Sequence, residues 1–85
     1  MKLRDEVLQR PLELWYLQVP MLKRLGERIQ ALRDARGLTQ QQLADKTGLS
    51  RGYLARLERG RHDPTSTTLA TIAKALRVPI ASLFR

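Results

Sequence analysis

The sequence has no cysteine, one histidine and few aromatic residues. The lack of cysteine excludes disulfides and thiolate metal sites, and it is compatible with a reducing cytoplasm. No cluster of carboxylates has a spacing that would supply an acid/base pair or a metal site, and no nucleophile comes with a matching base. We therefore expect a cytoplasmic protein that is not an enzyme and that needs neither a metal nor a cofactor.

Long hydrophobic runs are also lacking, so no segment is expected to span a membrane, and the early Asp5 and Glu6 argue against a signal peptide. Acidic residues are scarce, with 8 Asp and Glu against 16 Lys and Arg and a formal net charge of +8. The excess lies beyond residue 22, because the first 22 residues carry as many acidic as basic side chains. A chain of 85 residues predicts one small domain, and its charge predicts a polyanionic partner.

The most informative stretch is Leu38–Gly60, which has the pattern of two short helices joined by a tight turn. Thr39 is placed to cap the first helix, and Gln42 three residues later completes a capping box. Gly48 suits the left-handed conformation that ends a helix, and Ser50 is a ready cap for the next one. This stretch predicts a helix-turn-helix.

The second of these helices has two different faces. Leu54 and Leu57 share one side and are expected to be buried. The opposite side is cationic and nearly free of bulky apolar groups; it carries Arg51, Gly52, Ala55, Arg56 and Arg59.

Helical patterns also occupy the flanking sequence. Apolar residues recur at helical spacing from Met21 until Gly37, which predicts the first helix of the domain. After a loop at residues 61–64, Thr65 can cap a fourth helix, and a last short helix is expected to follow Pro79. The expected fold class is therefore all-α, with five helices.

Residues 1–20 leave several alternatives open. Lys2–Gln9 could form two helical turns, and Leu12–Val19 could form a short strand or a further helix. Their large apolar residues, Leu14, Trp15 and Leu17, fit either an interface with a subunit or partner, or an arm packed on its own domain. A third alternative is that Met21 is the natural start.

Taken together, the motifs resemble the lambda-repressor-like, Cro-type helix-turn-helix family, also called the XRE family. The resemblance covers Lys23–Phe84. It is carried by Leu38-Thr39-Gln40, Leu43-Ala44, Gly48-Leu49-Ser50, Tyr53-Leu54, Leu57-Glu58-Arg59-Gly60, Pro64 and Leu69. The resemblance implies a five-helix DNA-binding domain at residues 23–85, preceded by an N-terminal extension at residues 1–22.

The resemblance makes the second central helix the recognition helix, whose N-terminal end enters the major groove. The expected base contacts are Arg51, Gly52, Ala55 and Arg56, although Gly52 and Ala55 are smaller than the side chains that the family often has there. The expected phosphate contacts are Gln40, Tyr53, Arg59, Arg61 and His62. Tyr53 could instead be a packing residue, Gln40 only a good helix former, and His62 an ordinary polar residue of the surface.

Arg33 and Glu58 match positions that pair in this family, so we expect an ion pair between the first helix and the recognition helix. The alternative is that Glu58 merely offsets neighbouring arginines. The expected function is a transcriptional regulator, and more specifically a repressor that binds double-stranded DNA at a pseudo-palindromic operator as a homodimer. The alternative is an antitoxin or adaptor that binds a partner protein through residues 1–20 and autoregulates its operon.

Overall fold

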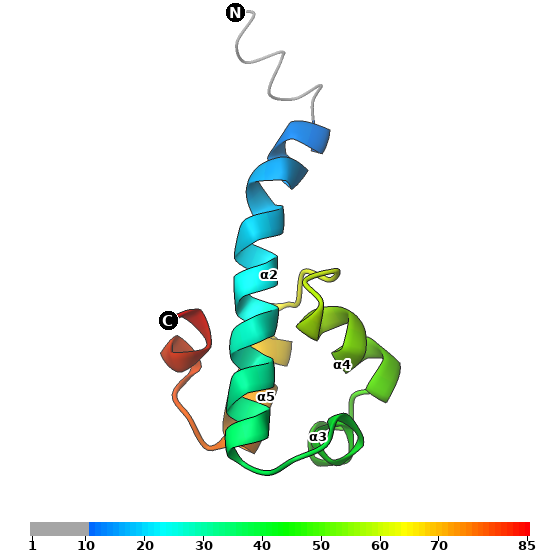
Figure 1. The fold of residues 1–85 in the computed structure, drawn as a ribbon, viewed down its shortest axis with the longest axis vertical. Coiled ribbons are helices and arrows are strands. Elements are labelled where there is room, and N and C mark those ends of the chain that lie inside the picture. Colours follow the sequence, from blue (N-terminus) through cyan, green and yellow to red (C-terminus); the bar gives the residue numbers. More distant parts are fainter. Residues whose placement is uncertain (1–10) are drawn as a thin grey trace, which may run out of the picture.

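The computed structural model describes the backbone of residues 11–85 and the side chains from residue 20 onward. The elements follow the order α2 (Pro11–Ala35), α3 (Gln40–Thr47), α4 (Arg51–Glu58), α5 (Ser66–Leu76) and the 3-10 helix η1 (Ile80–Phe84) (Figure 1). The described part of the chain has no strand, so the predicted all-α class is confirmed. The last of the five expected helices is a short 3-10 helix.

The first described helix is longer than the sequence pattern indicated. It begins at Pro11 instead of Met21 and continues through Pro20. Proline removes one backbone N–H, but its fixed φ angle is close to the helical value, so a single proline need not end a helix. The expectation that the helix begins at Met21 is therefore wrong, as is the strand alternative for residues 12–19. The two turns considered for residues 2–9 lie outside the described part.

The backbone of residues 11–20 extends beyond the other helices instead of folding back on them (Figure 1). Among the described residues, this part of α2 lies farthest from α3. The side chains of Leu14, Trp15 and Leu17, on which the interface and packed-arm alternatives depend, lie outside the described residues.

The helix starts follow the predicted capping chemistry. The Gln42 backbone N–H donates to the Thr39 hydroxyl at 3.0 Å, and the Gln42 side chain accepts from the Thr39 N–H at 2.9 Å. This capping box satisfies two backbone donors at the start of α3. Gly48 ends α3 with a φ of 77°, and the Ser50 hydroxyl then accepts from the N–H of Tyr53 at 3.0 Å to begin α4.

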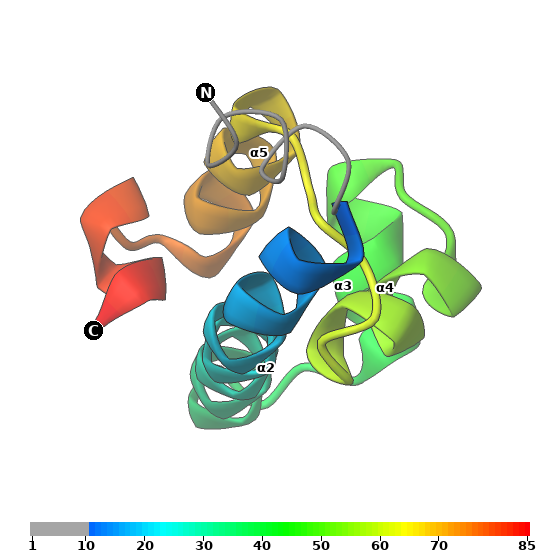
Figure 2. The same cartoon turned by 90° about the horizontal axis from the view of Figure 1, so that it is seen from above.

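The core lies where α3, α4, α5 and η1 meet the second half of α2. Viewed from above, α4 and η1 lie on different sides of α2 (Figure 2). The largest fully buried side chains come from all five elements and are Ile29, Leu43, Leu54, Leu57, Ile72, Leu76 and Leu83. Burial of this apolar surface fixes the position of α4 between the core and solvent. Within the described residues, we find no helix with the length and apolar character needed to cross a bilayer.

Candidate nucleic-acid interface

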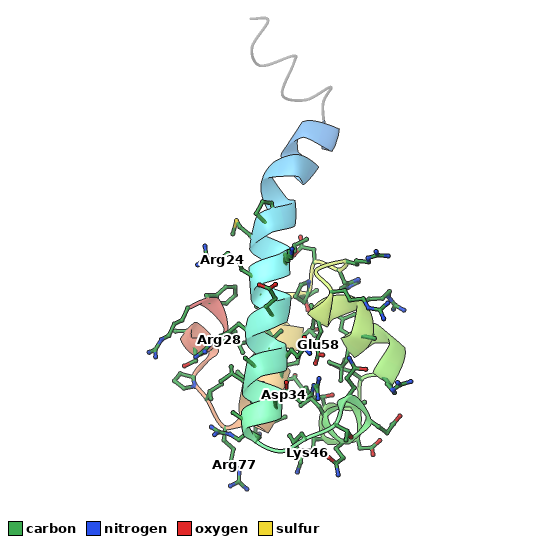
Figure 3. The ribbon with its side chains drawn as sticks, viewed as in Figure 1. Arg24, Arg28, Asp34, Lys46, Glu58 and Arg77 are labelled. Atoms are coloured by element: carbon green, nitrogen blue, oxygen red, sulfur yellow. The ribbon has the colours of Figure 1, made fainter. Side chains whose placement is uncertain are left out.

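The outer face of α4 is a row of exposed residues. Arg51, Gly52, Arg56 and Arg59 are exposed, and Ala55 is half-buried. Because Ser50 caps the helix, Arg51 is its first residue and lies at the end with the unpaired N–H groups. Nitrogen-tipped side chains extend from α4 on the side away from α2 (Figure 3). Among residues 20–85, these arginines have no side-chain hydrogen bond or ion pair.

Gly52 leaves room beside Arg56. A Cβ atom built on Gly52 would lie 3.7 Å from Nη1 of Arg56 and, outside the backbone of its own helix and the adjacent residues, would meet no other atom within 4 Å. The backbone at Gly52 is therefore bare except for this guanidinium, and a partner surface can approach it closely. The small side chains expected at the base-contacting positions thus lie on the exposed side, next to two arginines.

The inner face of α4 is held by Glu58. Its carboxylate accepts two hydrogen bonds from Arg33 of α2, from Nε at 2.8 Å and from Nη2 at 3.0 Å. Both side chains are buried, with 10% of Arg33 and 3% of Glu58 exposed. The two residues expected to pair therefore form a bidentate, buried ion pair. Figure 3 labels Glu58 between α2 and α4.

The pair is completed by two further contacts. Gln40 donates from Nε2 to Oε1 of Glu58 at 3.0 Å, and Arg33 donates from Nη1 to the Leu38 carbonyl at 2.7 Å. Hydrogen bonding to Glu58 raises the pKa of Arg33 above its ordinary value, although burial acts in the opposite direction. Arg33 is consequently charged throughout the usable pH range, and it joins α2 to α4 and to the segment just before α3.

Gly26 brings α2 against the C-terminal end of α4. A Cβ atom at this position would lie 2.5 Å from the backbone carbonyl oxygen of Glu58, closer than real Cβ contacts. Gly60 is similarly close, since its Cβ would lie 2.7 Å from the Cα of Lys23. The position of α4 therefore depends on backbone contacts that only glycine permits.

The segment after α4 holds the remaining predicted phosphate contacts. Arg61 is exposed, and its backbone N–H donates to the Arg56 carbonyl at 2.9 Å, which fixes its place at the end of the helix. Tyr53 and His62 are both half-buried and pack edge to face, with ring centroids 4.6 Å apart. Gln40 lies at the start of α3, with its amide turned to Glu58. The predicted residues thus separate into an exposed arginine set and a more enclosed set of Gln40, Tyr53 and His62.

Sequence reasoning missed Gly26 and the contact between Gln40 and Glu58. A glycine inside a helix was the available signal for Gly26, because glycine there costs stability unless packing requires it. No local signal links Gln40 to Glu58, which lie 18 residues apart.

The helix-turn-helix family model matches residues 29–83, a span that includes α3, the turn and α4. The chain belongs to the helix-turn-helix family. This confirms the resemblance found in the sequence, and α3 and α4 are the helix-turn-helix pair. A relative, the immunity repressor protein of Bacillus phage phi105, is 48% identical over 59 residues, which are 69% of this chain and 41% of the phage protein. This chain thus matches less than half the length of that relative.

Solved structures share the helix-turn-helix fold. The restriction-modification controller C.AhdI from Aeromonas hydrophila has a TM-score of 0.73 and 36% identity, over 74% of this chain and 96% of that protein. The controller C.Esp1396I, solved as a tetramer in complex with its natural 35 base-pair operator, has a TM-score of 0.69 and 33% identity, over 75% of this chain and 84% of that protein. Each similarity covers about three quarters of this chain.

Proposed function

We propose that the protein is a sequence-specific transcriptional regulator of the repressor type, which binds an operator through the outer face of α4. The observation that carries this proposal is the division of α4 between a buried anchor at Glu58 and an exposed row of unpaired arginines. Support comes from relatives named as an immunity repressor and as a controller protein in complex with its operator. Residues 23–85 would form the DNA-binding domain.

In the proposed complex, the N-terminal end of α4 enters the major groove. Arg51 has the planar fork that matches O6 and N7 of guanine, and Arg56 faces the groove one turn later. Gly52 permits close approach of the helix backbone, and Ala55 offers a methyl group to thymine. Arg59 and Arg61 would contact phosphates.

The enclosed residues have weaker roles in this proposal. The Gln40 side chain is committed to Glu58, so its contribution to phosphate binding would come from its backbone N–H at the start of α3. Tyr53 and His62 pack on one another and would contact phosphates only with their outer edges. All three belong to the rim of the proposed interface.

We infer that a second copy of the chain covers an apolar surface formed by α2 and η1. Met21, Phe84 and Ile80 are the exposed large hydrophobic residues of the described side chains, at 67%, 57% and 42%. A groove of about 170 Å³ is lined by Met21 and Phe84 together with Leu25 and Leu83. Pairing across this surface would present two α4 helices to half-sites about one helical turn apart. Phe84→Glu should give a monomer in sedimentation, and a dimer that persists would contradict the assignment.

The function is tested by selecting bound sequences from a random DNA pool and titrating the selected duplex. If each protomer neutralises three or four phosphates, a dimer should give a log-log salt slope of about −5 to −7. Selection of a pseudo-palindrome is the expected result. If the selection enriches no sequence, or if the salt slope is near zero, the protein is not a sequence-specific DNA-binding regulator.

A second candidate is an antitoxin or adaptor that holds a partner protein. The observation that favours it is the first part of α2, whose backbone extends beyond the other helices (Figure 1). Deleting residues 1–20 separates the candidates: a simple repressor keeps its operator preference, whereas an adaptor loses its partner.

A further inference from the structure

A second cationic surface lies away from α4. An open hollow of about 510 Å³ is lined by Lys46 from the last turn of α3 and by Thr71, Lys74, Ala75 and Arg77 from α5 and its end. We name this surface the α3/α5 hollow. No acidic side chain lines it, and its three charged residues are exposed. Figure 3 places Lys46 and Arg77 at the end of the molecule opposite the start of α2.

Arg77 stands where this chain otherwise uses glycine. The helices α2, α4 and α5 end in the same turn, in which the residue after a left-handed residue donates its N–H to the carbonyl five positions earlier. The bonds are Leu38 to Arg33, Arg61 to Arg56 and Val78 to Ala73. The left-handed residue in these turns is Gly37 after α2 and Gly60 after α4, but Arg77 after α5.

Arg77 has a φ of 60°. Among the described residues, it is the only one other than glycine with a positive φ. A side chain in this region costs free energy that glycine would avoid. The conformation of the turn therefore does not explain an arginine at this position. The charged side chain is what distinguishes Arg77 from the glycines of the other two turns.

Helix dipoles do not account for the cations of the α3/α5 hollow. The carbonyls at the end of α5 already have a partner, because Arg36 donates from Nε to the Leu76 carbonyl at 2.7 Å and from Nη2 to the Arg77 carbonyl at 3.4 Å. The ends of α3 and α5 together carry roughly one negative charge. The three positive charges of the hollow, on Lys46, Lys74 and Arg77, exceed this negative charge. Among the described residues, none of the three side chains forms an ion pair.

The composition of the hollow fits phosphates better than a protein. Protein interfaces have apolar or aromatic anchors and are depleted in lysine. The α3/α5 hollow has neither a large apolar nor an aromatic residue in its lining. Lysine, arginine and threonine are instead the side chains that contact the phosphate backbone of nucleic acids.

The hollow is separate from the proposed operator surface. No residue of α4 lines it, and α5 lies behind α2 in Figure 1, whereas α4 lies to one side. A duplex held by α4 would leave these cations free. We propose that the α3/α5 hollow binds the phosphate backbone of a second DNA segment while α4 holds the operator. The part of this proposal in which α4 holds the operator rests on the proposed function.

The test is a bridging assay with the full chain. An immobilised operator duplex should capture a fluorescent duplex of unrelated sequence only when protein is present. The test variant is Lys46→Gln, Lys74→Gln and Arg77→Gly, in which glycine also relieves the left-handed turn and so preserves the fold. Capture should fall at least tenfold, and operator affinity should change less than twofold.

A matched variant removes the same charge elsewhere. Gln30→Glu, Ala31→Glu and Ala35→Glu lower the net charge by the same three units at exposed positions of α2 that line neither the α3/α5 hollow nor the groove beside Met21, so capture should stay within twofold of the wild type. The inference is overturned if the wild-type protein captures no second duplex, or if the hollow variant captures as well as the wild type. It is also overturned if the hollow variant loses operator affinity in the same proportion, since its cations would then belong to the operator contact.

Two further measurements separate this inference from its alternatives. Arg51→Ala with Arg56→Ala should lose operator preference but keep hollow-dependent binding of unrelated DNA, so the failure of one proposal does not imply failure of the other. Unlabelled duplex should compete for capture, and polyglutamate of equal charge should not. Competition by polyglutamate alone would assign the hollow to an acidic protein and overturn the DNA assignment.

Discussion

The two faces of α4 differ in their contacts with the rest of the chain. On the inner face, Glu58 contacts Arg33 and Gln40, and its backbone carbonyl lies against Gly26. On the outer face, Arg51 and Arg56 are exposed and have no partner among the described residues. The inner face fixes where the helix lies, and the outer face is left free for a ligand. The comparison predicts that substitutions on the two faces affect different properties.

The largest effect is expected on the inner face, at the ion pair. Arg33→Ala leaves the buried Glu58 carboxylate without its bidentate partner, which should cost about 3 to 5 kcal/mol of unfolding free energy. Thermal and urea unfolding measure this loss. Arg24→Ala, an exposed arginine on the same helix, is the control and should stay within about 0.5 kcal/mol. An unchanged midpoint for Arg33→Ala would show that the pair does not hold α4.

A smaller loss is expected where α2 touches α4. Gly26→Ala forces a Cβ atom against the Glu58 carbonyl and should destabilise the fold by about 1 to 3 kcal/mol, despite the better helix propensity of alanine. The matched control is Gly52→Ala on the outer face, where the added carbon meets only Arg56 at 3.7 Å. Gly52→Ala should leave stability unchanged or raised. Equal stability of the two variants would contradict the close contact between α2 and α4.

On the outer face, substitutions should change DNA binding and leave stability almost unchanged. Arg51→Ala should cost about 1 to 3 kcal/mol of binding free energy on the preferred operator and relax the preference at one base pair. Titration against the operator and its single-base variants measures both effects. If Arg51→Ala keeps the full base preference, then Arg56 and not Arg51 makes the base contact.

The smallest effect is expected at the end of α4. Arg61→Ala should weaken binding to all sequences alike and flatten the log-log salt slope by about one unit, because one phosphate contact is lost. Titrations at several salt concentrations, with operator and with unrelated DNA, give this slope. A loss confined to the operator would make Arg61 a base contact instead.

The local features of the fold were predictable because their causes lie within a few residues. The cap at Ser50 and the capping box at Thr39 and Gln42 follow from side chains next to the backbone groups that they satisfy. The start of α2 was not predictable in this way. Pro20 has the sequence signal of a boundary, yet the helix continues through it.

Features that depend on distant parts of the chain were predicted only in part. The family resemblance supplied the pair of Arg33 and Glu58, which are 25 residues apart, but not the third member, Gln40. The turn at Arg77 was missed because its sequence signal, a glycine, is absent there. The outer arginines were found from helical spacing alone, and their contacts with DNA remain predictions.

The most direct test of the account is to record backbone amide NMR shifts while the selected operator duplex is added to the full chain. The largest changes should fall on the exposed residues of α4, Arg51, Gly52 and Arg56, and on Arg61, while the amides of Leu43 and Ile72 in the core hardly move. That result would assign the outer face of α4 to the operator. Largest changes at Met21 and Phe84, with α4 unmoved, would contradict it.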